Sequence, residues 1–484
     1  MSARTSLHVL SALVLLAGCA AGPDYHPAQH GVPGTFSPVA KANALEADPS
    51  VSLEIWWTVF HDSQLSSLIR SAAMSNLDLR LAAARVLEAR AQRGVASSEL
   101  FPHLGSTADY ARSRVSKHSI AGGQLTGQNR PLENGLFDAG IDMSWEIDVF
   151  GGTHRAAEAA NARLGATVES GHAAMVTVMA EVGLTYLDLR GVQRQLSIAR
   201  DNLRTQEETA ALAEDRFKSG LAGELDASRA LGEVARTRAQ IPPLEEARER
   251  ALYRLDVLLG KNPGELDAML GDVAPIPTAP PRVPLGLPSD LLRQRPDIRQ
   301  AERQLAAATA QVGVAAADLF PKFYLTGGVG LQSIESADFF TAGSRYWSIG
   351  PKITWPLFSA GKIRQNIHVQ TARQEQAAIV YEKTVLIALE ETQTALVAFG
   401  QEQERHRALV DAENASRRSF TFAKDRYRGG LVAFLDVLEA ERSLLAAQDA
   451  VAQGECRLSQ NLIRVFKALG GGWSTDTYGF VRTR

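Results

Sequence analysis

One stretch decides the fold: residues 137–149 read FDAGIDMSWEIDV. Its odd-numbered positions are apolar or small, whereas its even-numbered positions carry four acidic residues, a glycine and a serine. Such alternation is typical of a β-strand with one apolar and one polar face. It is longer than most soluble strands and fits a tilted membrane strand of about 9–11 residues plus its ends. We expect the acidic face to line a water-filled pore, and its acidic residues are Asp138, Asp142, Glu146 and Asp148.

Three further segments show the same alternation, at about 104–114, 322–333 and 345–357, with the first the weakest. The alternative is two soluble hairpins packed on a core, but isolated hairpins are marginal in water and the sequence offers no further strands for a sandwich. Four strands cannot enclose a lumen, so a barrel needs several chains, and three chains would supply twelve strands. Trp145, Trp347 and Trp355 would then lie near lipid or its interface with water.

The chain contains two copies of one unit. Leu100-Phe101-Pro102 recurs as Leu319-Phe320-Pro321, and Asp215-Arg216-Phe217 recurs as Asp425-Arg426-Tyr427. Each copy predicts a helix that ends at Leu-Phe-Pro, because the residue before a proline leaves the α region. Two strands, a long helix, a glycine turn and a returning helix follow. The predicted fold class is therefore mainly α with a membrane β-barrel, built from a duplicated helix–hairpin–long helix–helix unit.

Proline is segregated along the chain: none of the 20 prolines falls in 132–241 or 357–484. Since proline costs about 3 kcal/mol inside a helix, these stretches predict two long helices, at about 154–219 and 361–428. At 1.5 Å per residue each would extend about 100 Å, more than a compact domain can hold. Pro242-Pro243 predicts a kink or break in the first returning helix.

The N-terminus predicts the compartment. Arg4 precedes an apolar run from Leu7 to Ala17, which is too short for a mature membrane helix and is typical of a secretory signal. The run ends at Leu16-Ala17-Gly18-Cys19, which resembles a bacterial lipobox, so we expect a lipoprotein with acyl chains such as palmitate on Cys19. The alternative is a plain signal peptide with an incidental cysteine. An acidic residue at position 20 would resemble an inner-membrane retention signal, so Ala20 favours the outer membrane.

The predicted organisation has six segments. They are a signal peptide (1–18), a lipid-anchored N-terminal segment (19–61), a first repeat unit (62–274), a proline-rich linker (275–288), a second repeat unit (289–470) and a C-terminal tail (471–484).

Composition excludes several other classes of protein. The formal net charge of −3 creates no global field that attracts nucleic acid. Two cysteines cannot form a disulfide framework or a tetrahedral metal cage, and the ten histidines contain no His-Glu-x-x-His pair. Ala360-Gly361-Lys362-Ile363 lacks the Ser/Thr and the upstream glycine of a phosphate-binding loop. We therefore expect no enzyme, no metal site, no nucleic-acid partner and no cofactor beyond the covalent lipid.

Several motifs together resemble the outer-membrane efflux factor family of TolC-like channels, most closely its lipoprotein branch that serves RND-type multidrug pumps. They are Cys19 with Gly22-Pro23-Asp24-Tyr25, the sequence Leu287-Pro288-Ser289-Asp290-Leu291-Leu292 with Arg295-Pro296-Asp297-Ile298, the paired Leu-Phe-Pro sites, and Leu435-Asp436-Val437-Leu438 with Glu441-Arg442. The resemblance covers nearly the whole mature chain. It implies a homotrimer whose twelve-stranded barrel continues into a periplasmic barrel of helices, with an adaptor protein and an inner-membrane RND-type transporter as partners.

The resemblance also implies candidate site residues. Asp436 and Glu439 match an acidic periplasmic gate, although two acidic residues near a helix N-terminus can simply be stabilised by its dipole. Tyr427 matches a position that latches the closed gate, while Val432 stands where the family can place a basic residue. The tips that meet the adaptor match two turns that could equally just end their helices. These turns are Gly220-Leu221 and Gly430-Leu431.

The expected function is that of a passive exit duct, which conducts drugs or other small toxic compounds from the inner-membrane pump to the exterior. A channel of a type I secretion or metal-ion efflux system is the alternative within this class. A non-conducting periplasmic strut is the alternative of another class, and the alternating segment 137–149 argues against it.

Overall fold

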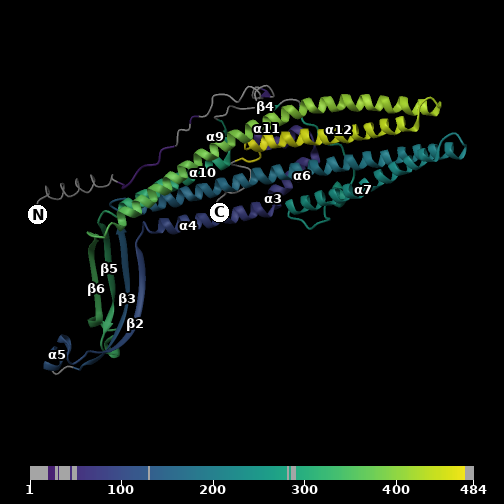
Figure 1. Cartoon of the computed structure of the whole chain (residues 1–484). Helices are drawn as coiled ribbons and strands as arrows, with labels where there is room; N and C mark the ends of the chain where they lie inside the picture. Colours follow the sequence, from purple (N-terminus) through teal and green to yellow (C-terminus); the bar gives the residue numbers. More distant parts are fainter. Residues whose placement is uncertain are drawn as a thin grey trace. The chain divides into compact units, whose positions relative to one another are not determined.

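The computed structural model describes residues 20–27, 31, 44–45, 52–128, 131–280, 283–284 and 290–474 (Figure 1). Cys19, the predicted lipidation site, lies outside the described residues. The chain divides into two compact units. The sheet unit comprises Met1–Ala28, Leu87–Ala166 and Ala301–Val380, and the helical unit comprises Gln29–Val86, Thr167–Gln300 and Tyr381–Arg484.

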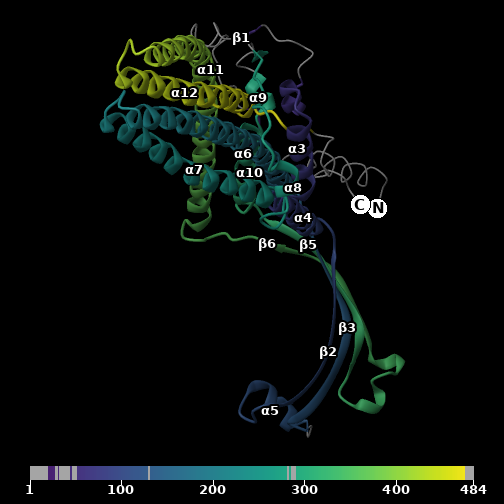
Figure 2. The same ribbon diagram turned by 90° about the vertical axis from the view of Figure 1, so that its right-hand side faces the viewer.

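The sheet unit is built around four antiparallel strands in the order β2-β3-β5-β6. Figure 2 shows them as one curved and twisted sheet. Pairing of β3 with β5 joins the two halves of the chain. The strands are β2 (His103–Arg114), β3 (Glu133–Ile147), β5 (Lys322–Ser333) and β6 (Arg345–Thr354).

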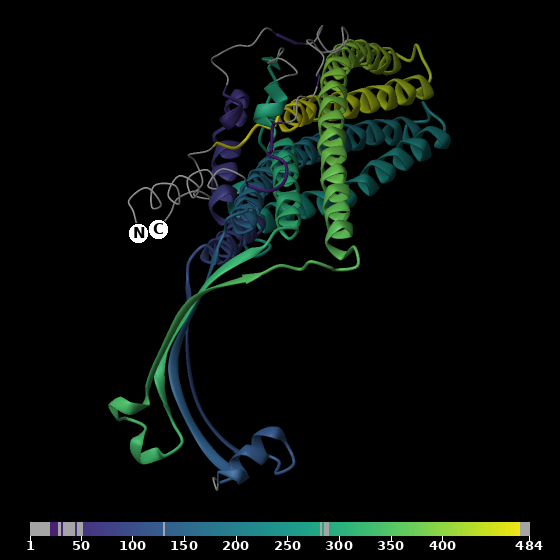
Figure 3. The same ribbon diagram turned by 90° about the vertical axis from the view of Figure 1, so that its left-hand side faces the viewer.

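Both hairpin connections lie at the same end of this sheet (Figure 3). The β2–β3 connection contains α5 (Ile120–Gly127), and the β5–β6 connection contains the short helices η3 (Ser336–Asp338) and η4 (Ala342–Ser344). The other end joins the helices, because β2 and β5 each follow a helix and β3 and β6 each precede one. The sheet therefore has a helix-proximal end and a distal end.

Strand register separates the sheet into two chemically different faces. Ile141 of β3 lies opposite Ser106 of β2 and Val329 of β5, and Val329 lies opposite Trp347 of β6. Since side chains alternate along a strand, the odd-numbered residues of β3 and their partners share one face. That face is largely apolar, and we call it the apolar face. The opposite, polar face carries Asp138, Asp142 and Glu146.

An equivalent tryptophan hydrogen bond links each hairpin to the helix that precedes it. The indole N–H of Trp145 donates to the carbonyl of Leu100 at 3.0 Å, and that of Trp355 donates to the carbonyl of Leu319 at 3.0 Å. Both acceptors belong to the Leu-Phe-Pro motifs. The duplicated motif thus places a free carbonyl where a tryptophan near the helix-proximal end of the sheet can reach it.

Long helices dominate the rest of the chain. The two longest, α6 and α11, each have 67 residues, and the returning helices α7 and α12 each have 35. The main helices are α4 (Leu77–Ser98), α6 (Gly152–Lys218), α7 (Glu224–Leu258), α10 (Pro296–Ala317), α11 (Lys362–Arg428) and α12 (Phe434–Ala468). Among the described residues no helix is both long and apolar enough to cross a membrane.

Helix α7 departs from the sequence expectation. It runs as one helix through Pro242 and Pro243, so of the predicted kink or break the break is absent. Both proline side chains are exposed, and water can therefore hydrate the carbonyls that lose their hydrogen bonds.

Shorter elements complete the helical unit and form part of its core. Trp56, 1% exposed, stacks on Phe466 of α12 with ring centroids 5.7 Å apart. Gly472 donates its N–H to the carbonyl of Leu53, so the chain after α12 is fastened beside this core. The shorter elements are η1 (Leu53–Phe60), α3 (Ser63–Ser75), α8 (Asp267–Leu270), α9 (Leu291–Gln294) and the paired strands β1 (Ala44–Leu45) and β4 (Val283–Pro284).

Candidate functional site

The two long helices end in the same kind of turn. After α6, the N–H of Leu221 donates to the carbonyl of Arg216 at 2.8 Å; after α11, the N–H of Leu431 donates to that of Arg426 at 2.9 Å. This bond requires a left-handed residue just before the leucine, and Gly220 and Gly430 have φ of 69° and 71°. The glycines therefore end their helices, which is one of the two roles considered for these turns.

The same turns expose a pair of apolar side chains. Leu221 is 68% exposed and Leu431 is 70% exposed, an unfavourable state for a leucine in water. In the part of the chain that the structure describes, nothing lies within 4 Å of the position that a Cβ would take at Gly220 or Gly430. The turns thus present open apolar tips in addition to ending the helices.

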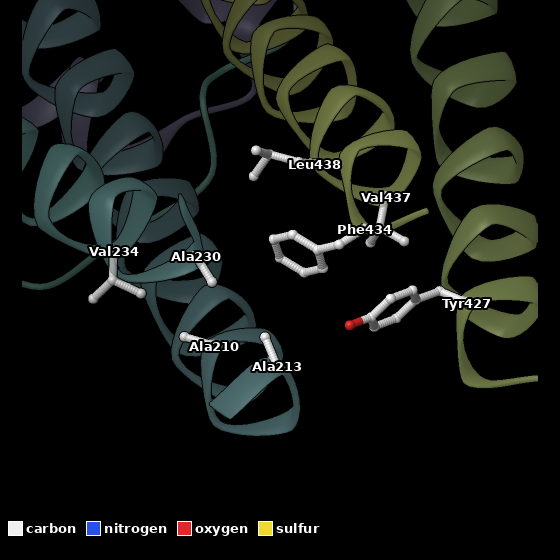
Figure 4. Close-up of a cluster of buried hydrophobic side chains, with 8 residues drawn as sticks. All are labelled: Ala210, Ala213, Ala230, Val234, Tyr427, Phe434, Val437 and Leu438. Carbon is white, nitrogen blue, oxygen red and sulfur yellow. The ribbon is translucent and has the colours of Figure 1, made fainter. Parts of the chain in front are cut away.

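A buried apolar cluster, the tip cluster, lies behind these turns and joins the two helical hairpins (Figure 4). Figure 4 shows the rings of Tyr427 and Phe434, from α11 and α12, facing the alanines of α6. Val432 packs against the cluster, so an apolar side chain stands where the family can place a basic residue. Its buried members are Ala210, Ala213, Ala230, Val234, Tyr427, Phe434, Val437 and Leu438.

Tyr427 lies at the centre of this cluster. It is 5% exposed; its ring meets that of Phe434 edge to face at 5.4 Å, and the Arg216 guanidinium lies 4.9 Å from its centroid. Burial raises the pKa of Tyr427; Arg216 opposes this effect and Asp226 adds to it. Among the described residues its hydroxyl has no hydrogen-bond partner, although the hydroxyl atom is buried. Leaving a buried hydroxyl unpaired costs about 1–3 kcal/mol, so the closed packing around Tyr427 is not fully satisfied within this chain.

The predicted gate acids both lie in the first turns of α12 and are exposed. Asp436 accepts a hydrogen bond from the N–H of Ala433 at 3.0 Å, which satisfies one of the free N–H groups at the start of the helix. A local capping role therefore accounts for part of Asp436. One Asp436 oxygen and the Glu439 carboxylate remain outside this cap.

A buried acidic pair, which the sequence analysis did not identify as a site, lies one turn further along. Glu233 of α7 is paired with Arg442 of α12 and, at 3.2 Å, with Arg236. Glu441 is 3% exposed, and burial raises its pKa to about 7; Lys424 opposes this shift and Glu233 adds to it. A signal was present, since Glu441 follows Val437 at the spacing of the apolar stripe of α12.

A groove runs beside this acidic pair. It has a volume of about 610 Å³ and is lined by side chains of α6, α7 and α12. Glu233, Arg236 and Arg442 lie in its wall together with Asp449, whose pKa is raised by burial. Polar groups thus reach the interior of the helix assembly close to the tip cluster.

The acidic residues predicted for the pore divide into two groups. Asp138, Asp142 and Glu146 share the polar face of β3, where Asp138 accepts a bond from the Gln332 amide at 2.8 Å. Asp109 lies directly opposite Asp138 on β2 and adds an acid that the sequence analysis missed, because alternation in β2 is weak. This face therefore concentrates negative charge.

Asp148 lies outside strand β3, so its assignment to the acidic strand face is wrong. The strand ends at Ile147, and Asp148 accepts bonds of 2.7 Å from the backbone N–H and from the ring of His154. Its side chain, 8% exposed, helps to start α6. The alternation of polar and apolar residues runs past the end of the strand, because the residue that helps to start α6 is polar as well.

The first described residues dock on the sheet unit. The N–H of Ala21 donates to the carbonyl of Phe150 at 2.9 Å, and the carboxylate of Asp24 accepts a bond of 2.5 Å from Arg155 of α6. Tyr25 donates to Glu302 of α10 at 3.1 Å. The Asp24 pair lowers the pKa of Asp24 and raises that of Arg155, the latter against the effect of burial. The chain immediately after position 19 is therefore held beside the helix-proximal end of the sheet.

Metal binding receives no support from the described residues, which contain no group of three or more His, Cys, Asp or Glu side chains that could hold an ion. Cys456 is also unsuited to surface chemistry. Its thiol donates to the carbonyl of Leu187 at 3.3 Å, and burial raises its pKa to about 12.

Comparison with known proteins adds independent evidence. A family model described as outer membrane efflux protein matches residues 68–261 and 287–471. The pyoverdine export outer membrane protein OpmQ of Pseudomonas aeruginosa is 33% identical over 480 residues, which are 99% of this chain and 99% of OpmQ. The probable outer membrane lipoprotein SilC of Salmonella typhimurium is 32% identical over 477 residues, covering 97% of this chain and 99% of SilC. The solved structure of the outer-membrane channel OprN is similar with a TM-score of 0.87 at 36% identity, covering 94% of this chain and 100% of OprN.

Proposed function

Because the chain belongs to the family of outer membrane efflux proteins, we propose that the acidic face of its sheet lines the pore and that its helix tips form the periplasmic gate. The chain is the outer-membrane channel of a tripartite efflux system and catalyses no reaction. Its partners are two further copies of itself, a periplasmic adaptor and an inner-membrane RND-type pump. Three copies complete a barrel of twelve strands, four from each chain, continuous with a periplasmic barrel of helices.

One observation carries the assignment of the pore surface: the strand register gathers the acidic side chains on one face and the large apolar side chains on the other. Lipid accepts the apolar face without cost, whereas carboxylates require water. In a closed barrel the polar face is the inner one. The pore wall is then negatively charged and favours cations.

Conductance tests this assignment. Purified trimers in a planar bilayer under a salt gradient should show a cation-selective reversal potential. Asp138→Asn with Asp142→Asn should move that potential toward zero, while Asp411→Asn, an exposed acid of α11, should leave it unchanged. A protein that inserts but never conducts would instead support the non-conducting strut.

The gate is assigned to the helix tips. Three copies of Asp436 and Glu439 around a narrowing would place like charges near one another, and like charges repel unless a cation lies between them. Packing in the tip cluster opposes this repulsion: Phe434 and Val437 are each 1% exposed. The closed state therefore balances apolar burial against repulsion between carboxylates.

Cation block tests the gate. Divalent cations added from the periplasmic side should reduce single-channel conductance, and Asp436→Ala with Glu439→Ala should weaken that block. Glu208→Ala with Glu382→Ala is a matched control, because it removes two exposed carboxylates from the long helices away from the first turn of α12. Unchanged block in the gate variant would remove these acids from the proposal.

Lipidation of Cys19 is a further part of the proposal. The contacts of Ala21, Asp24 and Tyr25 hold the following residues against α6 and α10, which suits a chain tethered at the membrane close to the strands. Metabolic labelling with a fatty acid should mark the wild type and not Cys19→Ser. Labelling of the serine variant would contradict the assignment, because Cys456 is half-buried, its thiol donates to the Leu187 carbonyl, and burial raises its pKa.

The adaptor-contact role belongs to Gly220-Leu221 and Gly430-Leu431, supported by the exposure of the two leucines. For the cargo we propose drugs or other small toxic compounds. OpmQ is named for pyoverdine export, CusC for cation efflux and TtgF for toluene efflux, so the relatives are named for different cargoes, and a metal-ion or secretion system stays the alternative. Susceptibility profiling of a deletion strain with organic toxicants and metal salts separates these possibilities.

A further inference from the structure

The distal end of the sheet carries a row of arginines on its apolar face. Arg112 and Arg114 of β2 and Arg345 of β6 occupy register positions of that face. We call these three residues the arginine rim. They are exposed, with the Arg112 and Arg114 side chains each 71% exposed.

The arginines of the sheet lie on the face opposite to all of its acids except Glu133. The polar face carries Asp109, Asp138, Asp142 and Glu146, whereas all three arginines of the four strands lie on the other face. The lysines of the strands, Lys322 and Lys352, lie on the polar face near the helix-proximal end. Arginines on an otherwise lipid-facing surface need a specific reason, since a guanidinium in hydrocarbon is costly without a counter-charge.

The counter-charge within the chain is incomplete. Glu133 accepts from Arg112 at 3.3 Å and from Arg114 at 3.2 Å, so one carboxylate is shared by two guanidinium groups. Arg345 has no carboxylate within ion-pair distance among the described residues. The rim therefore keeps a net charge of two positive units on this face.

Aromatic side chains lie among and on both sides of the rim residues along the strands. The ring centroids of Tyr110 and Phe137 are 4.5 Å apart, and the ring centroid of Phe339, from the β5–β6 connection, lies 6.2 Å from that of Phe137. Phe340 and Trp347 are 84% and 77% exposed. Aromatic belts mark the level of lipid headgroups, so the arginines, which lie among these aromatic side chains, lie at that level.

We propose that the arginine rim binds the phosphate groups of an anionic glycolipid in the outer leaflet of the outer membrane. Guanidinium groups bind phosphate in a bidentate manner, and the apolar and aromatic surface next to them accommodates acyl chains. The distal end is assigned to the outer leaflet because the helices leave from the other end of the strands. This inference rests on the membrane position given to the sheet under the proposed function.

Native mass spectrometry of the purified trimer with diphosphorylated lipid A as the probe tests the inference. The wild type should retain lipid A, and Arg112→Gln/Arg114→Gln/Arg345→Gln should lose it by at least tenfold, given about fivefold per arginine near a charged lipid surface. Arg→Lys at the same three positions should keep most of the binding, which separates loss of charge from misfolding. Lys322→Gln/Lys352→Gln, which removes charge from the other face, should bind as the wild type does.

Two results would overturn the inference. One is equal retention of lipid A by the wild type and the Gln variant; the other is equal retention of lipid A lacking its phosphates or of phosphatidylglycerol. Bilayer conductance of the same Gln variant should match the wild type, because the rim lies outside the pore. Loss of lipid binding alone thus bears on the rim, whereas a wild type that does not conduct would refute the proposed function.

Discussion

Glu441 gives the sharpest quantitative prediction. Its carboxyl group is buried beside the tip cluster, faced by Lys424 of α11 and Glu233 of α7, and burial raises its pKa from 4.5 to about 7. A buried acid with a raised pKa binds its proton more tightly in the packed state than in a state where it reaches water. Burial of Glu441 therefore does not destabilise the packed helix tips at low pH. The packed tips lose stability as the pH rises from about 4.5 through 7.

The magnitude follows from the size of the shift. At 1.36 kcal/mol per pKa unit the penalty is about 1 kcal/mol at pH 5 and about 3 kcal/mol at pH 8, which is roughly two orders of magnitude in population. Glu441→Gln keeps the shape of the side chain and removes the titration. We expect the variant to be more stable than the wild type around the tips by about 1 kcal/mol at pH 5 and by about 3 kcal/mol at pH 8.

Hydrogen exchange in residues 434–445 of the solubilised trimer is the assay, corrected for the intrinsic pH dependence of exchange. Glu224→Gln is the matched control, because it removes an exposed carboxylate from the first turn of α7 and leaves the gate acids in place. Protection of the wild type should fall between pH 5 and pH 8, that of Glu224→Gln should fall equally, and that of Glu441→Gln should stay level. The reasoning is refuted if Glu441→Gln keeps the wild-type pH dependence.

Three other changes test the packing. Trp355→Phe removes the indole bond to Leu319 and should cost about 1 kcal/mol, visible as a lower thermal midpoint of the trimer. Gly430→Ala forces a side chain into a φ of 71°, which should cost about 1–2 kcal/mol and increase exchange at the end of α11; unchanged exchange would exclude a strained turn. Gly313→Ala would bring a Cβ within 2.8 Å of the Ala21 carbonyl, so protease should cleave the N-terminal segment faster, and equal cleavage rates would contradict its docking.

The fold class could be predicted because the patterns of alternation and of missing proline extend over long stretches of the sequence. In residues 137–149 the alternation gave the two faces of β3, since period two allows only one assignment of faces. Its ends were less certain: β3 begins at Glu133 and ends at Ile147, so Asp148 was misassigned. A polar residue that caps a helix and a polar residue on a strand face look alike in one sequence.

Other features depend on tertiary contacts that a sequence does not display. Glu441 is buried only because α7, α11 and α12 meet around it, and its partner group Glu233 is more than two hundred positions away. Asp109 became part of the acidic face only through its register with Asp138. Conversely, the resemblance placed Asp436 in the gate but could not show that one of its oxygens caps α12.

The most direct test of the central claim is thiol accessibility along β3 during single-channel recording. Asp138→Cys and Asp142→Cys should react with a charged, water-soluble thiol reagent and change the conductance, whereas Ala139→Cys and Ile141→Cys should not. Cys456 should not react, because it is half-buried, its thiol is bonded to the Leu187 carbonyl, and burial raises the pKa of that thiol to about 12. Reaction at the odd-numbered positions, or at both sets equally, would contradict a pore lined by the acidic face of the sheet.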